Sequence, residues 1–160
     1  MSQNVLIAYY SLTGTTQQFA EAIQAAAGGD LFAIEMVTPY PKVYSEVLKV
    51  SREDWKNKVR PPLKNTVKEI SDYEVIFIGS PNWFSTMAPP VFSFLESHDL
   101  AGKKVVPFLT HGGGGISNSF REVAEALPNS EMLAGLAIAR SHIHETRTKV
   151  EPWLQDIGVI

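Results

Sequence analysis

The chain has 160 residues, of which 44% are apolar and 19% charged, an ordinary balance for one globular domain with one core. Its net charge of −3 is too small to indicate a nucleic-acid partner, and the absence of cysteine excludes disulfides, thiolate catalysis and zinc–thiolate sites. No apolar run approaches the ~20 residues of a membrane-spanning helix, and Met1–Asn4 lack the basic start of a signal peptide, so we expect a cytoplasmic protein without membrane insertion.

Apolar runs of strand length alternate with segments of helical spacing along most of the chain. Residues 5–10 are apolar throughout, which is the pattern of a strand buried on both faces of a parallel sheet. Further strands are predicted over 31–34, 75–79, 104–109 and 132–138, although Pro107 weakens the fourth because proline cannot donate to a sheet ladder. Helices are predicted to begin at Thr15 or Thr16 and at Pro89–Pro90, and to cover 117–127 and 145–155.

This alternation predicts an α/β fold. The expected architecture is a doubly wound five-stranded parallel sheet with strand order 2-1-3-4-5 and helices on both faces, formed by residues 1–160 as one domain. In that order the connections after strands one and three leave in opposite directions and open a crevice at the carboxyl ends of the strands. A ligand is expected there, between the loops 11–16 and 81–88, with 111–116 beside them.

Residues 38–70 interrupt the alternation. Prolines at 39, 41, 61 and 62 bracket a polar stretch that we expect to contain a helix, and we interpret the segment as one long crossover on a sheet face. It carries eight basic and four acidic residues, a charge of +4, so the rest of the chain carries −7. A basic segment on an acidic body is either a docking face or a solvated helix face.

The loop Ser11-Leu12-Thr13-Gly14-Thr15-Thr16 lies between the first strand and the first helix and holds four hydroxyls and one glycine. A helix start offers unpaired N–H groups and a partial positive charge, which together bind an anion, and Gly14 lets the backbone approach it closely. The loop lacks the lysine of a triphosphate-binding P-loop and the GxGxxG of a dinucleotide-binding loop, which leaves a single terminal phosphate as the predicted ligand. The alternative is a hydroxyl-rich turn that only caps the helix.

Four segments resemble those of flavodoxins. The stretch 8–16 is similar to the FMN-phosphate loop of that family, S/T-x-T-G-x-T. The stretches 79–88 and 108–114 resemble two flavin-ring loops of a bacterial subgroup of short flavodoxin-like proteins, and 38–41 matches the crossover of that subgroup. The resemblance covers nearly the whole chain and implies a flavodoxin-like fold with FMN as the cofactor. The FMN-binding residues that it implies are Ser11, Leu12, Thr13, Gly14, Thr15, Thr16, Pro81, Asn82, Trp83, Phe84, Thr110, His111, Gly112, Gly113 and Gly114.

A flavin ring needs flat apolar surfaces and backbone donors for its pyrimidine edge. Trp83 and Phe84 offer stacking area, and because adjacent aromatics in an extended loop point in different directions, we expect Trp83 to line the flavin and Phe84 to pack on protein. The alternative is two aromatics that seal the edge of the domain.

The run of four glycines at 112–115 allows the backbone to lie against a flat ligand, although the same run would also form a flexible loop. Thr110 and His111 are expected to face the same crevice. Neither 81–91 nor 110–119 contains Asp or Glu, and with a cationic His111 a bound flavin would have a raised reduction potential.

Other proteins of this fold class are excluded by single residues. A response-regulator receiver needs an aspartate where this chain has Gly79-Ser80-Pro81, and a low-molecular-weight tyrosine phosphatase needs a cysteine. His142 and His144 are interpreted as exposed residues without a carboxylate neighbour, and no metal site is predicted.

Two functions remain open. The first is a flavodoxin-type electron-transfer protein that docks to a redox partner protein, and the second is an FMN-dependent NAD(P)H oxidoreductase that reduces a quinone-like or other small acceptor. The lack of a second nucleotide motif favours the carrier, whereas a pI of about 5.8 and the basic crossover depart from the strongly acidic flavodoxins. In either case the flavin supplies the redox chemistry, and no side chain is identified as a catalytic acid or base.

Overall fold

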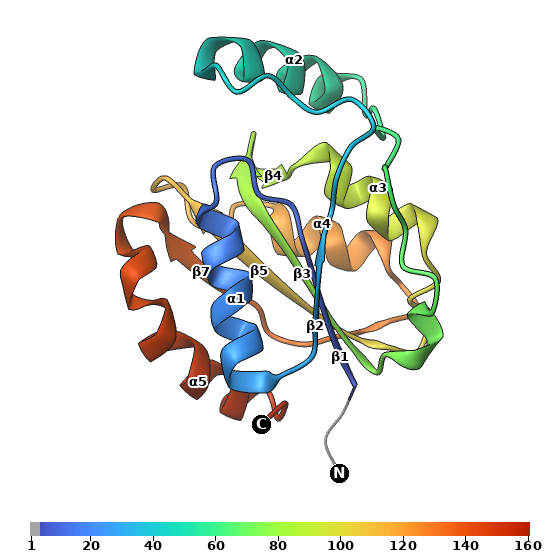
Figure 1. Ribbon diagram of the computed structural model, residues 1–160, viewed down its shortest axis with the longest axis vertical. Helices are drawn as coiled ribbons and strands as arrows, with labels where there is room; N and C mark the ends of the chain where they lie inside the picture. The colour runs from blue at the N-terminus through green and yellow to red at the C-terminus, as the bar shows by residue number, and fades with distance from the viewer. Residues whose placement is uncertain (1–3) are drawn as a thin grey trace.

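The computed structural model describes residues 4–160 and shows a central sheet with helices on both sides (Figure 1). The expectation of no signal peptide rests on Met1–Asn4, and Met1–Gln3 of this stretch lie outside the described residues. The strands are β1 (Val5–Tyr9), β2 (Asp30–Ala33), β3 (Val75–Trp83), β4 (Thr86–Met87), β5 (Lys104–His111), β6 (Glu131–Met132) and β7 (Leu136–Ala139). The α-helices are α1 (Thr15–Ala27), α2 (Tyr44–Lys56), α3 (Pro89–Ser97), α4 (Ser119–Ala126) and α5 (Thr146–Asp156), with 3₁₀-helical segments η1 (Ile70–Asp72) and η2 (Arg140–Glu145).

The strands of the main sheet run parallel in the order β2-β1-β3-β5, and β6 and β7 both pair with β5 at the far edge. In the register Val5 lies opposite Val75, and Val75 lies opposite Lys104. This is the doubly wound order predicted from the sequence. The carboxyl ends of β1, β3 and β5 therefore meet at one edge of the sheet.

The fifth position of the sheet is divided between two short strands, where the sequence predicted one strand over 132–138. Met132 of β6 lies opposite Val105, whereas Leu136 of β7 lies opposite Phe108. The interruption lies beside Pro107, which stays within β5 but has no N–H to donate to a neighbouring strand. Pro107 thus leaves β5 continuous, and the interruption lies between β6 and β7, which pair with β5.

Successive residues of the central strands supply two separate cores. Ile7 and Phe77 are fully buried and pack with α1 and α5, while Leu6 and Ile76 point to the opposite face and pack with α3 and α4. Because both faces are covered by helices, both sets of side chains must be apolar, which explains the uninterrupted apolar runs in the sequence. Within 4–160, no helix has the length and apolar character to cross a membrane.

The long crossover between β2 and β3 packs on the α3 and α4 side of the core through Met36, Tyr40 and Val47, but it also extends beyond the sheet face on which the sequence analysis placed it. Its two arms pair with each other through an isolated antiparallel bridge between Met36 and Leu63, so that α2 forms the tip of a long excursion beyond the carboxyl ends of the strands (Figure 1). The Tyr40 hydroxyl donates to Asp54 Oδ2 of α2 at 2.7 Å, and Val47 of α2 is buried against the α3 and α4 side of the core. These contacts hold α2 above the edge of the sheet where the ligand was predicted.

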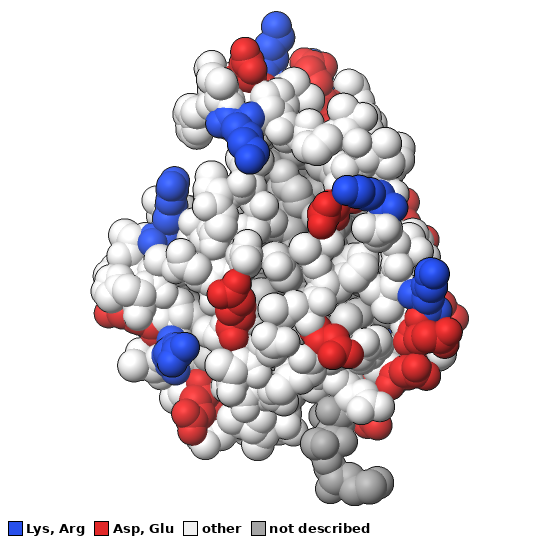
Figure 2. Space-filling view, in the orientation of Figure 1, with Lys and Arg blue, Asp and Glu red and all other residues white. Residues whose placement is uncertain are grey.

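The charge on the crossover is mixed. Side chains of both signs lie over α2 at the top of Figure 2, so this face is not uniformly basic. Two of the crossover's bases are paired with acids outside it, Arg60 with Glu96 and Lys64 with Glu35, the latter pair at 3.9 Å.

Candidate functional site

The loop 11–16 closes on itself between β1 and α1. The Ser11 Oγ accepts hydrogen bonds from the backbone N–H groups of Gly14 at 3.1 Å and Gln17 at 3.2 Å. Gly14 occupies the N-cap position of α1 with φ of 97°, a left-handed conformation that glycine adopts without strain. Thr16 Oγ1 lies 2.8 Å from Thr110 Oγ1, which joins the loop to the end of β5.

This loop has the donors that an anion requires. The first turn of α1 contains no acidic residue, and the N–H groups of Thr15 and Thr16 have no hydrogen-bond partner in the part of the chain that the structure describes. Free N–H groups at the start of a 13-residue helix, beside neutral hydroxyls, fit a phosphate group.

Pro81, Asn82 and Trp83 lie on a strand, where the sequence analysis expected a loop. They form the end of β3, which turns through Phe84 and Ser85 into β4 with Trp83 opposite Thr86. Phe84 and Ser85 have φ of 55° and 68°, so both central residues of this two-residue hairpin are left-handed. This backbone conformation usually requires Asn-Gly and is strained for a phenylalanine.

Trp83 and Phe84 pack against different parts of the protein. The Trp83 ring lies 5.6 Å from both the Tyr10 and the Tyr40 rings, while the Phe84 ring lies 5.4 Å from the ring of Trp55 on α2. Burial raises the pKa of Tyr10 to about 12, and burial together with the hydrogen bond to Asp54 raises the pKa of Tyr40. Both phenols beside Trp83 therefore stay neutral to a higher pH than a free tyrosine does.

The glycine loop after β5 is tied to His111 and to Asn82. His111 Nδ1 accepts hydrogen bonds from the N–H groups of Gly113 at 3.0 Å and Gly115 at 3.2 Å. Asn82 Nδ2 donates to the Gly115 carbonyl oxygen at 2.8 Å, which links the two predicted ring loops. The cationic His111 suggested from the sequence is inconsistent with this arrangement, because a protonated Nδ1 cannot accept either bond.

One cavity of about 340 Å³ at the carboxyl edge of the sheet brings these segments together. All of the FMN-binding residues named from the sequence line it except Gly14, Gly113 and Gly114. One of these residues has an unsatisfied polar atom, because Asn82 Oδ1 is buried and has no hydrogen-bond partner among residues 4–160. Among the described residues that line the cavity there is no Asp or Glu.

Sequence analysis missed two parts of the lining. One face of α2 contributes Tyr44, Val47, Leu48 and Ser51, whose spacing along the chain is that of a single helix face. Arg140 contributes from the first position after β7. Its place directly after the last strand, at the same edge of the sheet, was the signal that could have identified it.

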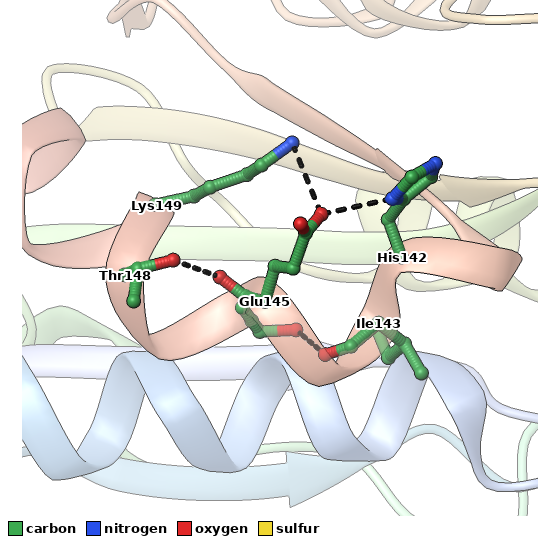
Figure 3. Close-up of polar contacts among 6 residues, drawn as sticks. His142, Ile143, Glu145, Thr148 and Lys149 are labelled. Carbon is green, nitrogen blue, oxygen red and sulfur yellow. Dashed lines mark hydrogen bonds and ion pairs between the residues drawn. The ribbon is translucent and has the colours of Figure 1, made fainter.

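The two histidines considered as metal ligands lie away from this cavity. His142 Nδ1 lies 2.9 Å from Glu145 Oε2, and that oxygen lies 3.9 Å from Lys149 Nζ (Figure 3). The sequence interpretation overlooked Glu145, which follows His144 directly in the sequence and whose carboxylate lies beside His142. Over 4–160 no group of three or more His, Cys, Asp or Glu side chains has an arrangement that could hold a metal ion.

Comparison with known proteins gives one family. The family model described as flavodoxin matches residues 4–157. A candidate flavoprotein from Bacteroides eggerthii, whose crystal structure is solved, is 33% identical with a TM-score of 0.82, over 99% of this chain and 100% of that chain. A flavoprotein from Lactobacillus acidophilus in complex with FMN has a TM-score of 0.78 at 20% identity, over 95% of this chain and 99% of that chain, which shows a shared fold.

A curated relative carries an enzyme name. The NAD(P)H dehydrogenase (quinone) of Paracoccus denitrificans is 34% identical over 95 residues, which are 58% of this chain and 43% of that protein. The chain thus matches less than half the length of this relative.

Proposed function

The chain belongs to the flavodoxin family and is an FMN-binding flavoprotein, and from this premise we propose that it is an electron-transfer protein that passes electrons between redox partner proteins. In this proposal the loop 11–16 binds the phosphate, and the ring lies between 81–84 and 110–112. Bound FMN supplies the electron-transfer chemistry, and the protein binds it, orients it and sets its potential.

The observation that carries the proposal is the cavity at the carboxyl edge of the sheet. It joins a wall of hydroxyl and N–H donors, from the start of α1, to a wall that contains Trp83 and Phe84. FMN has the matching chemistry, with an anionic phosphate at one end and a flat ring at the other. A doubly wound sheet binds its ligand at this switch point.

Two features support a carrier. The volume of about 340 Å³ is near the lower end of the usual range for pockets that hold one small molecule, which fits a protein that binds one cofactor and no second nucleotide. Tyr44 lines the cavity and is also 76% exposed, so an aromatic side chain at the rim is accessible to a partner protein.

An FMN-dependent NAD(P)H oxidoreductase that reduces a quinone-like acceptor is the second candidate. The partial match to the Paracoccus NAD(P)H dehydrogenase (quinone) supports it. The absence of carboxylates from the described cavity lining supports it as well, because a lining without acidic side chains opposes a negative charge on the reduced ring less than an acidic one does, and so suits two-electron transfer.

Anaerobic mixing of the FMN-loaded protein with NADH or NADPH separates the two. A carrier should keep its visible flavin absorbance with either nucleotide and lose it when dithionite or a flavodoxin reductase is added. Rapid bleaching by NADH or NADPH alone, followed by reoxidation with a quinone, would contradict the carrier and establish the reductase.

The same proposal treats residues 1–160 as one flavodoxin-like domain that acts in the cytoplasm. Limited proteolysis should yield no stable fragment that contains only part of the sheet. Cell fractionation should recover the protein with cytoplasmic markers. Cleavage into two stable fragments, or recovery with membranes, would contradict these two points.

A further inference from the structure

His111 connects the sheet to the glycine loop. It is the last residue of β5, lies opposite Ala139 of β7, and its side chain lines the cavity. Its Nδ1 accepts the N–H groups of Gly113 and Gly115, and these two glycines have φ of 134° and 67°. The imidazole therefore holds a loop whose backbone conformation only glycine adopts easily.

These two bonds determine where the imidazole carries its proton. An imidazole nitrogen that accepts hydrogen bonds has no proton, so a neutral His111 carries its single N–H on Nε2. The opposite tautomer would direct an N–H at two other N–H groups. Nε2 has no hydrogen-bond partner among the residues that the structure describes, which leaves one donor available on a side chain that lines the cavity.

We propose that His111 is a two-sided positioning residue. Its Nδ1 holds the loop 112–115 in shape, and its Nε2–H donates a hydrogen bond to an acceptor atom of the bound flavin ring. This inference rests on the proposed function, because it requires FMN in the cavity. The charged side chain that lines the same cavity is Arg140, and no described carboxylate lines the cavity to compete for the Nε2–H.

The donor should affect reduced FMN more than oxidised FMN. Reduction adds electron density to the ring, so a hydrogen bond from Nε2–H is stronger after reduction than before it. Tenfold tighter binding of the reduced form corresponds to a potential about 30 mV higher for a two-electron couple. Through this hydrogen bond a neutral His111 would raise the reduction potential of bound FMN. The positive charge on His111 that the sequence analysis considered is not needed for this effect.

Three substitutions separate the role of Nδ1 of the His111 imidazole from the role of Nε2. His111→Asn keeps an acceptor oxygen near the position of Nδ1 and loses the outer donor. His111→Gln places an amide donor near the position of Nε2 and loses the acceptor for the glycines. His111→Phe keeps a flat ring and loses both, and His144→Phe, at an exposed histidine away from the cavity, is the matched control.

Each variant is measured for FMN affinity, for the midpoint potential of bound FMN, and for amide exchange at Gly113 and Gly115. Each lost hydrogen bond should weaken FMN binding about fivefold, with the largest loss in His111→Phe. Amide protection at the two glycines should persist in His111→Asn and be lost in the other two. The potential should fall in His111→Asn and His111→Phe, and remain near the wild-type value in His111→Gln and His144→Phe.

Nitrogen NMR of the wild-type FMN-loaded protein tests the tautomer without any variant. The inference predicts a protonated Nε2 and an unprotonated Nδ1 in His111. A protonated Nδ1, or wild-type potentials in all three His111 variants, would overturn it. Failure of the wild-type protein to bind FMN would instead contradict the proposed function.

Discussion

The two ends of the cavity are built in different ways. The end that we propose binds the phosphate, the phosphate end, is mostly local, because the loop 11–16 receives its shape from its own Ser11 hydroxyl and from the helix that follows it, with the Thr16–Thr110 contact as a link to β5. The end that we propose binds the flavin ring, the ring end, is assembled from segments that are far apart in the sequence. Asn82 reaches Gly115, and Phe84 reaches Trp55 on the crossover.

This difference determines what a substitution should disturb. A change at the phosphate end should alter ligand affinity and leave the fold nearly as stable as before. A change at the ring end should alter both affinity and stability, because the same side chains line the cavity and join the segments that surround it. Substitutions at the two ends, with their effects on affinity and stability measured separately, test this contrast.

Gly14→Val should remove most of the preference for FMN over riboflavin, on the order of a 100-fold loss in FMN affinity. Valine is strained at φ of 97°, so the loop moves away from the position in which its N–H groups converge. Flavin fluorescence titration measures the affinity. Gly28→Val is the matched control, because Gly28 also has a positive φ, of 74°, and open space around its Cβ position, but lies at the other end of α1. Equal losses in both variants would show that strain in α1, and not the loop, controls binding.

Trp83→Ala should weaken FMN binding about fivefold beyond the loss of buried area and make the bound flavin brighter, because a stacked indole quenches flavin fluorescence. Because Trp83 packs against Tyr10 and Tyr40, Trp83→Ala should also lower the free energy of unfolding, by about 2 kcal/mol. This loss is smaller than the one expected for a fully buried tryptophan. Tyr73→Ala, at a partly buried aromatic residue just before β3 that does not line the cavity, is the control. If Phe84→Ala gives the brighter flavin and Trp83→Ala does not, the roles of the two aromatics are exchanged.

The ring end should also be sensitive to alkaline pH. Burial raises the pKa of Tyr10 from 10.0 to about 12, so folding favours the neutral phenol. The stability that comes from this preference is fully present below pH 10 and is lost as the pH rises toward 12. The free energy of unfolding of Tyr10→Phe, measured against pH, should therefore fall less steeply above pH 10 than that of the wild-type protein. Parallel curves would show that Tyr10 ionises as readily in the folded chain as in the unfolded one.

Ser85→Gly should have the smallest effect. Glycine relieves the left-handed strain at φ of 68° but adds flexibility to the unfolded chain, so we expect a net gain of about 0.5 kcal/mol in the free energy of unfolding. FMN affinity should stay within about twofold, because the strain lies in the hairpin turn and Ser85 does not line the cavity. Denaturant titration measures the first quantity. The same change at Ser45, within α2, should destabilise the protein by about 0.5–1 kcal/mol.

The sequence predicted the parts of the molecule that depend on local chemistry. The apolar runs identified the central strands because residues buried on both faces must all be apolar, and the loop 11–16 was correctly placed between a strand and a helix because both elements have clear patterns next to it. The hairpin at Phe84 and Ser85 was missed because it lacks the Asn-Gly that usually indicates such a turn.

Long-range arrangement accounts for the remaining differences. The position of α2 depends on the pairing of Met36 with Leu63, for which the sequence between them gives no local signal. The proton position on His111 depends on the backbone of Gly113 and Gly115, whose path only the folded loop shows. Pro107 was noted as a weakness in its own strand, whereas the gap lies in its neighbour.

The most direct test compares the affinities of the purified wild-type protein for FMN and for riboflavin, which differ only in the phosphate. If the start of α1 binds that phosphate, FMN should bind at least about 100-fold more tightly, because two charge-assisted hydrogen bonds of ~1.5 kcal/mol each give that ratio. Comparable affinities for FMN and riboflavin would contradict the assignment of the loop 11–16 as the phosphate site.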